Sequence, residues 1–179
     1  MNCIVLDSDV VSSFVIVKRI DILISLFSKQ LILLDFVKDE LMRGPKYYHN
    51  IKKYIDNGEI IEINISTATD QDVLKEYSEI TSDYFSIGKG EAIGMAYCYV
   101  HDCILASNNF KDIRKYCCKH KIQMLTVSRI LYKAYNNIID YKNGVIIYDS
   151  MIQKGIKLPY ISFKELISNV PLELKKENF

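Results

Sequence analysis

The sequence has little of several residue types. Its 179 residues include no tryptophan, three prolines, seven glycines and three histidines, and the formal net charge is only +1. So small a net charge excludes a general basic field for nucleic acid, so any contact with RNA must come from a local patch. The histidines show no ligand spacing and none lies at a predicted strand end, which disfavours zinc hydrolysis and metal-free general-base catalysis.

Long apolar runs are also missing. The most apolar stretch, residues 22–37, is interrupted by serine, lysine, glutamine and aspartate, so it does not predict a membrane span. The sequence starts MNCIVLDSDVV, without a basic leader and with aspartates where a signal peptide would be apolar. We therefore expect a cytoplasmic protein without membrane contact.

The cysteines form no CxxC pair, and their number is odd: they are Cys3, Cys98, Cys103, Cys117 and Cys118. A disulfide framework normally shows an even count, and a zinc site normally shows closely paired ligands. The sequence therefore favours reduced, partly buried thiols, as in a cytosolic protein.

The sequence does contain enough apolar residues to form the core of one domain, since hydrophobic residues make up 49% of it. Short continuous apolar runs predict strands covered on both faces, over residues 2–6, 30–34, 103–106 and 122–127. Residues 59–65 alternate polar and apolar and predict an edge strand. Each continuous run is followed by a helical pattern, and this alternation predicts an α/β fold with a parallel sheet.

Helical spacing of apolar residues predicts helices over 11–27, 45–57, 70–80, 91–100, 111–120 and 128–139, followed by two more over 143–155 and 162–170. No repeat, low-complexity segment or linker divides the chain. We therefore expect a main domain over residues 1–140 and a helical extension over residues 141–179 that packs on the same domain.

Polar and acidic residues follow the predicted strands at their carboxyl ends, where sites form in open parallel sheets. Asp7 ends the first strand, with Asp9 close by. Glu40 lies in the helix after the second strand, on an inward face with Val37 and Leu41. The strand over 103–106 is followed by Ser107, Asn108, Asn109 and Asp112.

Glu91 opens a helix whose packed face would hold Ala92, Met95 and Ala96. A carboxylate on such a face is costly unless it is hydrogen-bonded, paired or bound to metal. Carboxylates brought together repel one another, and Mg²⁺ or Mn²⁺ relieves that repulsion. Such a cation activates water and stabilises charge on a phosphoryl group, so the natural chemistry is phosphodiester hydrolysis.

These residues lie in motifs that resemble those of PIN-domain proteins, in particular VapC-like toxins and small prokaryotic PIN-domain proteins. IVLDSDVV resembles the opening strand with its first catalytic aspartate, FVKDEL the segment with the glutamate, and GKGEAIGMA the acidic helix start. Residues 104–134 are similar to the part that carries the last acid. The resemblance covers about residues 1–139, and the tail over 149–167 is similar to a C-terminal extension of some members.

The resemblance implies a PIN-like three-layer fold with a central parallel sheet of about five strands. It implies an endoribonuclease that depends on Mg²⁺ or Mn²⁺, and a toxin that a small antitoxin protein holds inactive. Homodimers are frequent in the family. Its catalytic and metal-binding residues map to Asp7, Glu40, Glu91 and Asp112, with Asn109 as a further ligand and Asp9, Ser107 and Asn108 as supporting polar residues.

One departure from the family leaves alternatives open. Asn108 and Asn109 stand where the family often has an aspartate, so Asp112 would supply the last acid. If Asp112 points away, three acids and an asparagine are left, which favours a catalytically degenerate PIN fold that binds protein or RNA. A receiver-like signalling domain is a third option, but Ala-Ser-Asn stands where that class needs an aspartate.

A cluster of basic residues follows the expected site and is a candidate RNA-binding patch. It includes Lys111, Arg114 and Lys115. The alternative is an ordinary solvated helix face, because the whole chain is rich in lysine.

Overall fold

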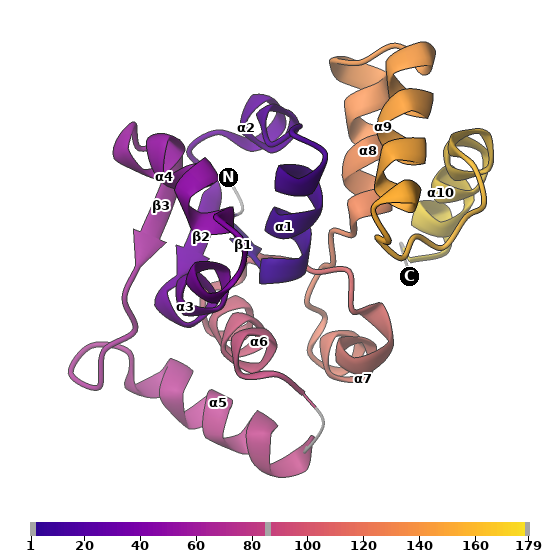
Figure 1. Ribbon diagram of the computed structural model, residues 1–179. Coiled ribbons are helices and arrows are strands. Elements are labelled where there is room, and N and C mark those ends of the chain that lie inside the picture. Colours follow the sequence, from indigo (N-terminus) through magenta and orange to yellow (C-terminus); the bar gives the residue numbers. More distant parts are fainter. Residues whose placement is uncertain (1–2, 85–86, 178–179) are drawn as a thin grey trace.

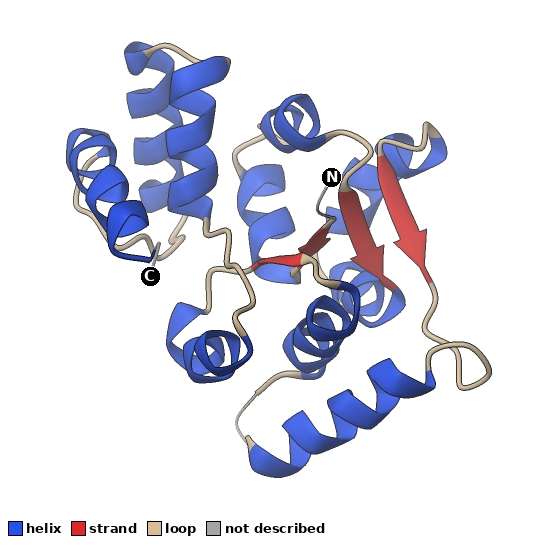
Figure 2. Cartoon of the chain, turned by 180° about the vertical axis from the view of Figure 1, so that it is seen from behind, coloured by secondary structure: helices blue, strands red, loops and turns tan. Residues whose placement is uncertain are grey.

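The computed structural model describes residues 3–84 and 87–177, apart from the side chains of Phe110, Asp112 and residues 173–177. In this part of the chain, four parallel strands form one sheet in the order β3-β2-β1-β4. The strands are β1 (Ile4–Leu6), β2 (Leu31–Leu34), β3 (Ile60–Ile63) and β4 (Ile104–Ala106). The predicted α/β fold with a parallel sheet is therefore confirmed, and β3 is the predicted edge strand (Figure 2).

The prediction of about five strands is wrong for the described chain. Residues 122–127 contribute only a single bridge between Leu105 and Met124. The reason is that the helix before this segment ends only a few residues before the next helix begins. Lys121, with a φ of 57°, ends one helix, and the hydroxyl of Thr126 caps the next, which leaves only residues 122–125 to pass beside β4.

Helices cover both faces of the sheet and give three layers (Figure 1). Ile4 and Leu6 of β1 point to one face, and Val5 between them points to the other. The first face packs against α1 (Ser8–Ile16), α2 (Asp21–Phe27), α3 (Asp35–Arg43), α4 (Tyr47–Asp56) and α8 (Val127–Asn137). The second face packs against α5 (Gln71–Asp83), α6 (Lys89–His101) and α7 (Phe110–His120).

The single helix predicted over residues 11–27 is two helices in the structure. Lys18 takes a φ of 58°, its N–H donates to the carbonyl of Val15, and the N–H of Arg19 donates to the carbonyl of Phe14. This pair of bonds is a Schellman motif, which ends α1 before α2 begins.

The C-terminal extension consists of α9 (Tyr141–Gln153) and α10 (Phe163–Glu177). Both helices lie beside α8 at one side of the molecule (Figure 1), and Tyr148, Phe163 and Leu166 belong to the same buried cluster as the α8 side chains. A Cβ at Gly144 would collide with the ring of Phe163, so only glycine allows these two helices to approach so closely.

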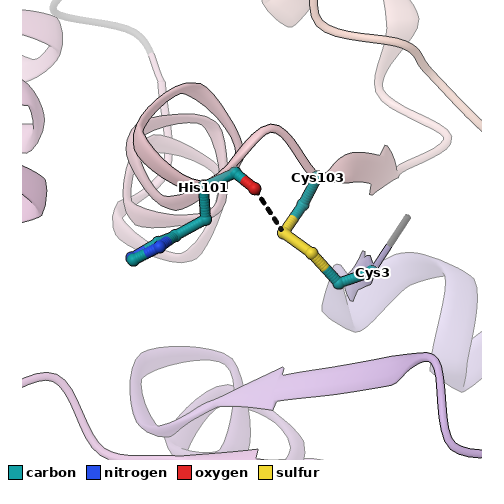
Figure 3. The surroundings of a disulfide bond; sticks show 3 residues. All are labelled: Cys3, His101 and Cys103. Atoms are coloured by element: carbon teal, nitrogen blue, oxygen red, sulfur yellow. Dashed lines mark hydrogen bonds between the residues drawn. A yellow bond between two sulfur atoms is a disulfide. The ribbon is translucent and has the colours of Figure 1, made fainter. Parts of the chain in front are cut away.

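A disulfide joins Cys3 and Cys103, just before β1 and β4 (Figure 3). Ile4 pairs with Ile104 in the parallel ladder, so the residues that precede them are neighbours, with Cα atoms 4.9 Å apart. The expectation that all cysteines are reduced thiols is therefore wrong for this pair, although Cys98, Cys117 and Cys118 are free. Disulfides are typical of oxidising compartments, so the cysteines give no support to a cytoplasmic location.

Within residues 3–84 and 87–177, none of the helices has the length and apolarity that crossing a bilayer requires.

Candidate functional site

The carboxyl ends of β1 and β4 lie next to each other at the point where the strand order reverses. The chain runs outward from β1 to β3 and then returns to add β4 on the other side of β1. Ligands of open parallel sheets bind outside the strands at such a switch point. Asp7 follows β1 there, and its N–H donates to the carbonyl of Ala106 at the end of β4 (2.9 Å). The candidate site is built around this pair of strand ends.

Asp7 is nearly inaccessible, with 4% of its surface exposed. It is the N-cap of α1, where its Oδ1 accepts a hydrogen bond from the Ser8 N–H (2.7 Å). Burial raises the pKa of Asp7 well above its ordinary value, and the nearby charges of Asp9 and Glu91 act in the same direction. Hydrogen bonds from Ser107 and Ser8 lower the pKa but do not offset the burial. Asp7 is therefore a buried acid whose charge is poorly compensated.

Asp9 lies in the first turn of α1 and faces the same site. Its Oδ2 accepts a hydrogen bond from the Asn108 N–H (2.9 Å), and its Oδ1 is buried without a partner among the described residues. Burial raises the pKa of Asp9 to about 6, with the charges of Glu91 and Glu40 adding to the effect. The sequence assigned Asp9 a supporting role, but the structure places it within the electrostatic reach of the other acids.

Glu40 points inward from α3, as its position on the apolar face predicts. Its Oε2 accepts a hydrogen bond from the Ser8 hydroxyl (2.8 Å), and its Oε1 accepts one from the Gly90 N–H (3.2 Å). Donors from two other helices, α1 and α6, therefore hold the carboxylate in place.

Glu91 occupies the first turn of α6, where its Oε2 accepts a hydrogen bond from the Gly88 N–H (3.2 Å). Its Oε1 accepts one from the Asn109 side chain (2.6 Å), and the Asn109 N–H donates to the Ser107 hydroxyl (3.2 Å). Glu91 is therefore linked to the residues after β4, and this contact brings Asn109 into the site.

The remaining candidates lie on α7. The side chain of Asp112 is outside the described part of the structure, so its expected role as a ligand stays a prediction. Lys111, Arg114 and Lys115 are exposed on α7, which begins directly after Asn109. The Lys115 ammonium lies over the ring of Tyr84, 5.8 Å from its centroid.

Three contributors to the site were not predicted as site residues: Ser8, Gly88 and Gly90. Each donates a hydrogen bond to Glu40 or Glu91. Both glycines lie in GKGEAIGMA, the segment that resembles the acidic helix start, but that resemblance assigns no role to Gly88 or Gly90. In the structure, Gly88 caps α6 and Gly90 lies inside it, where alanine would be the better helix former.

The oxygen donors fit a hard divalent cation by their chemistry. Carboxylate, amide and hydroxyl oxygens are the ligands that Mg²⁺ and Mn²⁺ prefer. The partnerless Oδ1 of Asp9 is a buried acceptor of this kind. Across the described residues, however, no three His, Cys, Asp or Glu side chains lie close enough together to hold a metal ion in their present positions. Metal binding would require the hydrogen-bonded carboxylates to move.

Comparison of the sequence with models of known protein families finds no match, and comparison with curated proteins finds none either.

The Gly90→Ala substitution is expected to displace the Glu40 carboxylate. A Cβ at this position would lie 2.7 Å from Glu40 Oε1 and 2.9 Å from Glu40 Cδ. We expect the affinity for Mn²⁺, measured by calorimetry, to fall by about tenfold, the effect typical of disturbing the surroundings of a metal site. Gly88→Ala is the matched control, because its Cβ would lie at an ordinary 3.6 Å from Glu91 Oε2. Equal affinities of the two variants would contradict this role for Gly90.

The raised pKa of Asp9 predicts a pH-dependent stability in the absence of metal. Folding favours the protonated carboxyl, so its stabilising contribution is fully present below the ordinary pKa of 3.8 and is lost as the pH rises through about 6. We expect the free energy of unfolding, measured with urea and a chelator, to fall by about 1–3 kcal/mol relative to Asp9→Asn between about pH 4 and pH 7. Parallel pH profiles of the two proteins would contradict the prediction.

Proposed function

We propose that this chain is a PIN-domain endoribonuclease that depends on Mg²⁺ or Mn²⁺. The observation that carries the proposal is the convergence of four carboxylates on the switch point between β1 and β4. Asp7 and Asp9 come from the N-cap and first turn of α1, Glu40 from α3 and Glu91 from α6. The charge of Glu91 acts on both aspartates, and the charge of Glu40 acts on Asp9. Acids whose pKa values are raised by burial, as are those of Asp7 and Asp9, are characteristic of functional sites.

Asp7, Glu40 and Glu91 would hold the cation, and Asp9 adds an oxygen that lacks a hydrogen bond. Asn109 and Asp112 are the further candidate ligands. When bound, the cation supplies Lewis-acid stabilisation of the charge that develops on a phosphoryl group. It also offsets the mutual repulsion of the acids.

The chain's own residues would orient these acids. Ser8 and Gly90 fix Glu40, while Gly88 and Asn109 fix Glu91. These bonds keep each carboxylate at the site, from where it would shift to reach the cation. The proposed reaction adds water to phosphorus and breaks the bond to the 3′ oxygen, so the products carry a 5′-phosphate and a 3′-hydroxyl.

We further propose that the protein is the toxin of a toxin–antitoxin pair and acts on RNA in the cytoplasm. Its partners would be the RNA substrate and a small antitoxin protein, and it would form a homodimer as many PIN-domain proteins do. These partners rest on the sequence resemblance alone.

A second candidate function is a catalytically degenerate PIN fold that binds protein or RNA. The hydrogen bonding of the acids favours it: both oxygens of Glu40 and both oxygens of Glu91 already accept bonds from the chain. A site whose carboxylates are satisfied in this way does not need a cation to be stable.

Incubation of the purified protein with single-stranded RNA separates the two candidates. The nuclease is expected to cleave with Mn²⁺ and to stop when EDTA is added, and end analysis should find 5′-phosphates on the products. RNA that stays intact with Mn²⁺, although the protein binds it, would favour the binding module and overturn the enzyme assignment.

A further inference from the structure

The segment between α9 and α10 is tied to the candidate site by one side chain. The Asn108 N–H donates to Asp9 Oδ2, and the Asn108 side-chain amide donates to the backbone carbonyl of Lys157, both at 2.9 Å. Through these two bonds, Asn108 connects the C-terminal extension to a carboxylate of the site. Lys157 nevertheless lies 49 positions beyond Asn108 in the sequence.

Residues 156–161, which we call the strap, alternate between half-buried and exposed positions. The side chains of Ile156, Leu158 and Tyr160 pack against the core cluster around α8. The Tyr148 hydroxyl donates to the carbonyl of Tyr160 (2.6 Å) and fixes the far end of the strap. Because side chains alternate in direction along an extended chain, Lys157 points away from this core.

Lys157 is therefore an exposed cation on a fixed backbone beside a cluster of acids. It forms no ion pair with any described residue. Four carboxylates repel a polyanion, and the net charge of +1 gives the chain as a whole no field to overcome that repulsion. A local cation would offset this repulsion, and the strap carries one whose backbone is held by Asn108, the residue that also binds Asp9.

We propose that Lys157 binds a phosphate of the RNA strand adjacent to the scissile one, and that Asn108 is the positioning residue that holds the strap at the site. This inference rests on the proposed ribonuclease function and names the element of the extension that contacts the substrate. The C-terminal extension would then contact the substrate in addition to packing against the core of the domain.

The test measures binding of a fluorescein-labelled oligouridylate by anisotropy in EDTA, so that no cleavage occurs, over a series of salt concentrations. A phosphate contact releases counterions, so loss of one contact lowers the slope of log affinity against log salt by about 0.7 for a single strand. We expect this reduction, with a several-fold loss of affinity, in Lys157→Ala. A purely structural role would not change the slope.

Lys154→Ala is the matched control, because Lys154 is an exposed lysine at the end of α9 with no ion pair to the described site residues. Asn108→Ala keeps the N–H that binds Asp9 but loses the bond to the Lys157 carbonyl. It should lower the slope as Lys157→Ala does, and the double variant should bind no more weakly than Lys157→Ala.

The outcomes separate this inference from the function on which it rests. Binding by the unaltered protein together with equal slopes for Lys157→Ala and Lys154→Ala would overturn the inference alone. Absence of both RNA binding and RNA cleavage by the unaltered protein would overturn the proposed function and the inference with it.

Discussion

Replacing Asp7 with asparagine is expected to lower Mn²⁺-dependent RNA cleavage by at least about a hundredfold, because even the supporting partners of metal ligands are worth about 10–100-fold. Asparagine keeps the oxygen that caps α1 through the Ser8 N–H, so the fold should persist. It also removes a buried charge whose pKa burial has raised, so the metal-free variant should unfold at a higher temperature than the unaltered protein near neutral pH.

Initial rates on a labelled RNA and a thermal melt of the same sample measure both effects. Asp39→Asn is the matched control, because it removes an exposed carboxylate next to Glu40 on α3. Undiminished cleavage by Asp7→Asn would remove Asp7 from the catalytic machinery. A loss of cleavage that accompanies unfolding would also contradict the prediction, which requires a folded, inactive protein.

Loss of the Cys3–Cys103 disulfide is expected to destabilise the protein by about 4 kcal/mol. The bond joins residues separated by 100 positions, and a cross-link over so long a loop strongly restricts the unfolded chain. Urea unfolding of the Cys3→Ser/Cys103→Ser double variant against the oxidised protein measures the difference. Cys118→Ser, which alters an exposed free thiol, is the control.

The same double variant should retain its cleavage rate when it is folded. The disulfide lies just before the amino ends of β1 and β4, whereas the candidate site lies at their carboxyl ends, so the two features are at opposite ends of these strands. Coinciding unfolding curves for the double variant and the oxidised protein would contradict the role of the bond in stability. Loss of activity below the unfolding transition would contradict its separation from the site.

The main layers of the fold follow from the sequence because strands buried on both faces are continuously apolar. Two such continuous apolar runs, Leu31–Leu34 and Ile4–Leu6, are strands in the structure. The predictions that fail concern where helices and strands begin and end. A one-residue backbone reversal at Lys18 divides a segment whose apolar residues keep helical spacing on both sides of it. The caps at Lys121 and Thr126 reduce the last expected strand to a bridge.

Strand-end and helix-face arguments predict that Asp7 and Glu40 face the carboxyl ends of the strands, since both occupy positions set by local periodicity. They do not predict what holds these acids. Glu40 accepts hydrogen bonds from Ser8 and Gly90, which are 32 and 50 positions away in the sequence. Cys3 and Cys103, which the strand register brings together, are 100 positions apart. Contacts of this kind depend on how the helices pack, and no short sequence pattern records that packing.

Calorimetric titration of Mn²⁺ into the metal-free protein tests most directly whether the acids at the carboxyl ends of β1 and β4 share one cation. We predict saturable binding by the unaltered protein, and binding weaker by at least about tenfold in both Asp7→Asn and Glu91→Gln. An unaltered protein that shows neither binding heat nor a rise in unfolding temperature with Mn²⁺ would contradict the account.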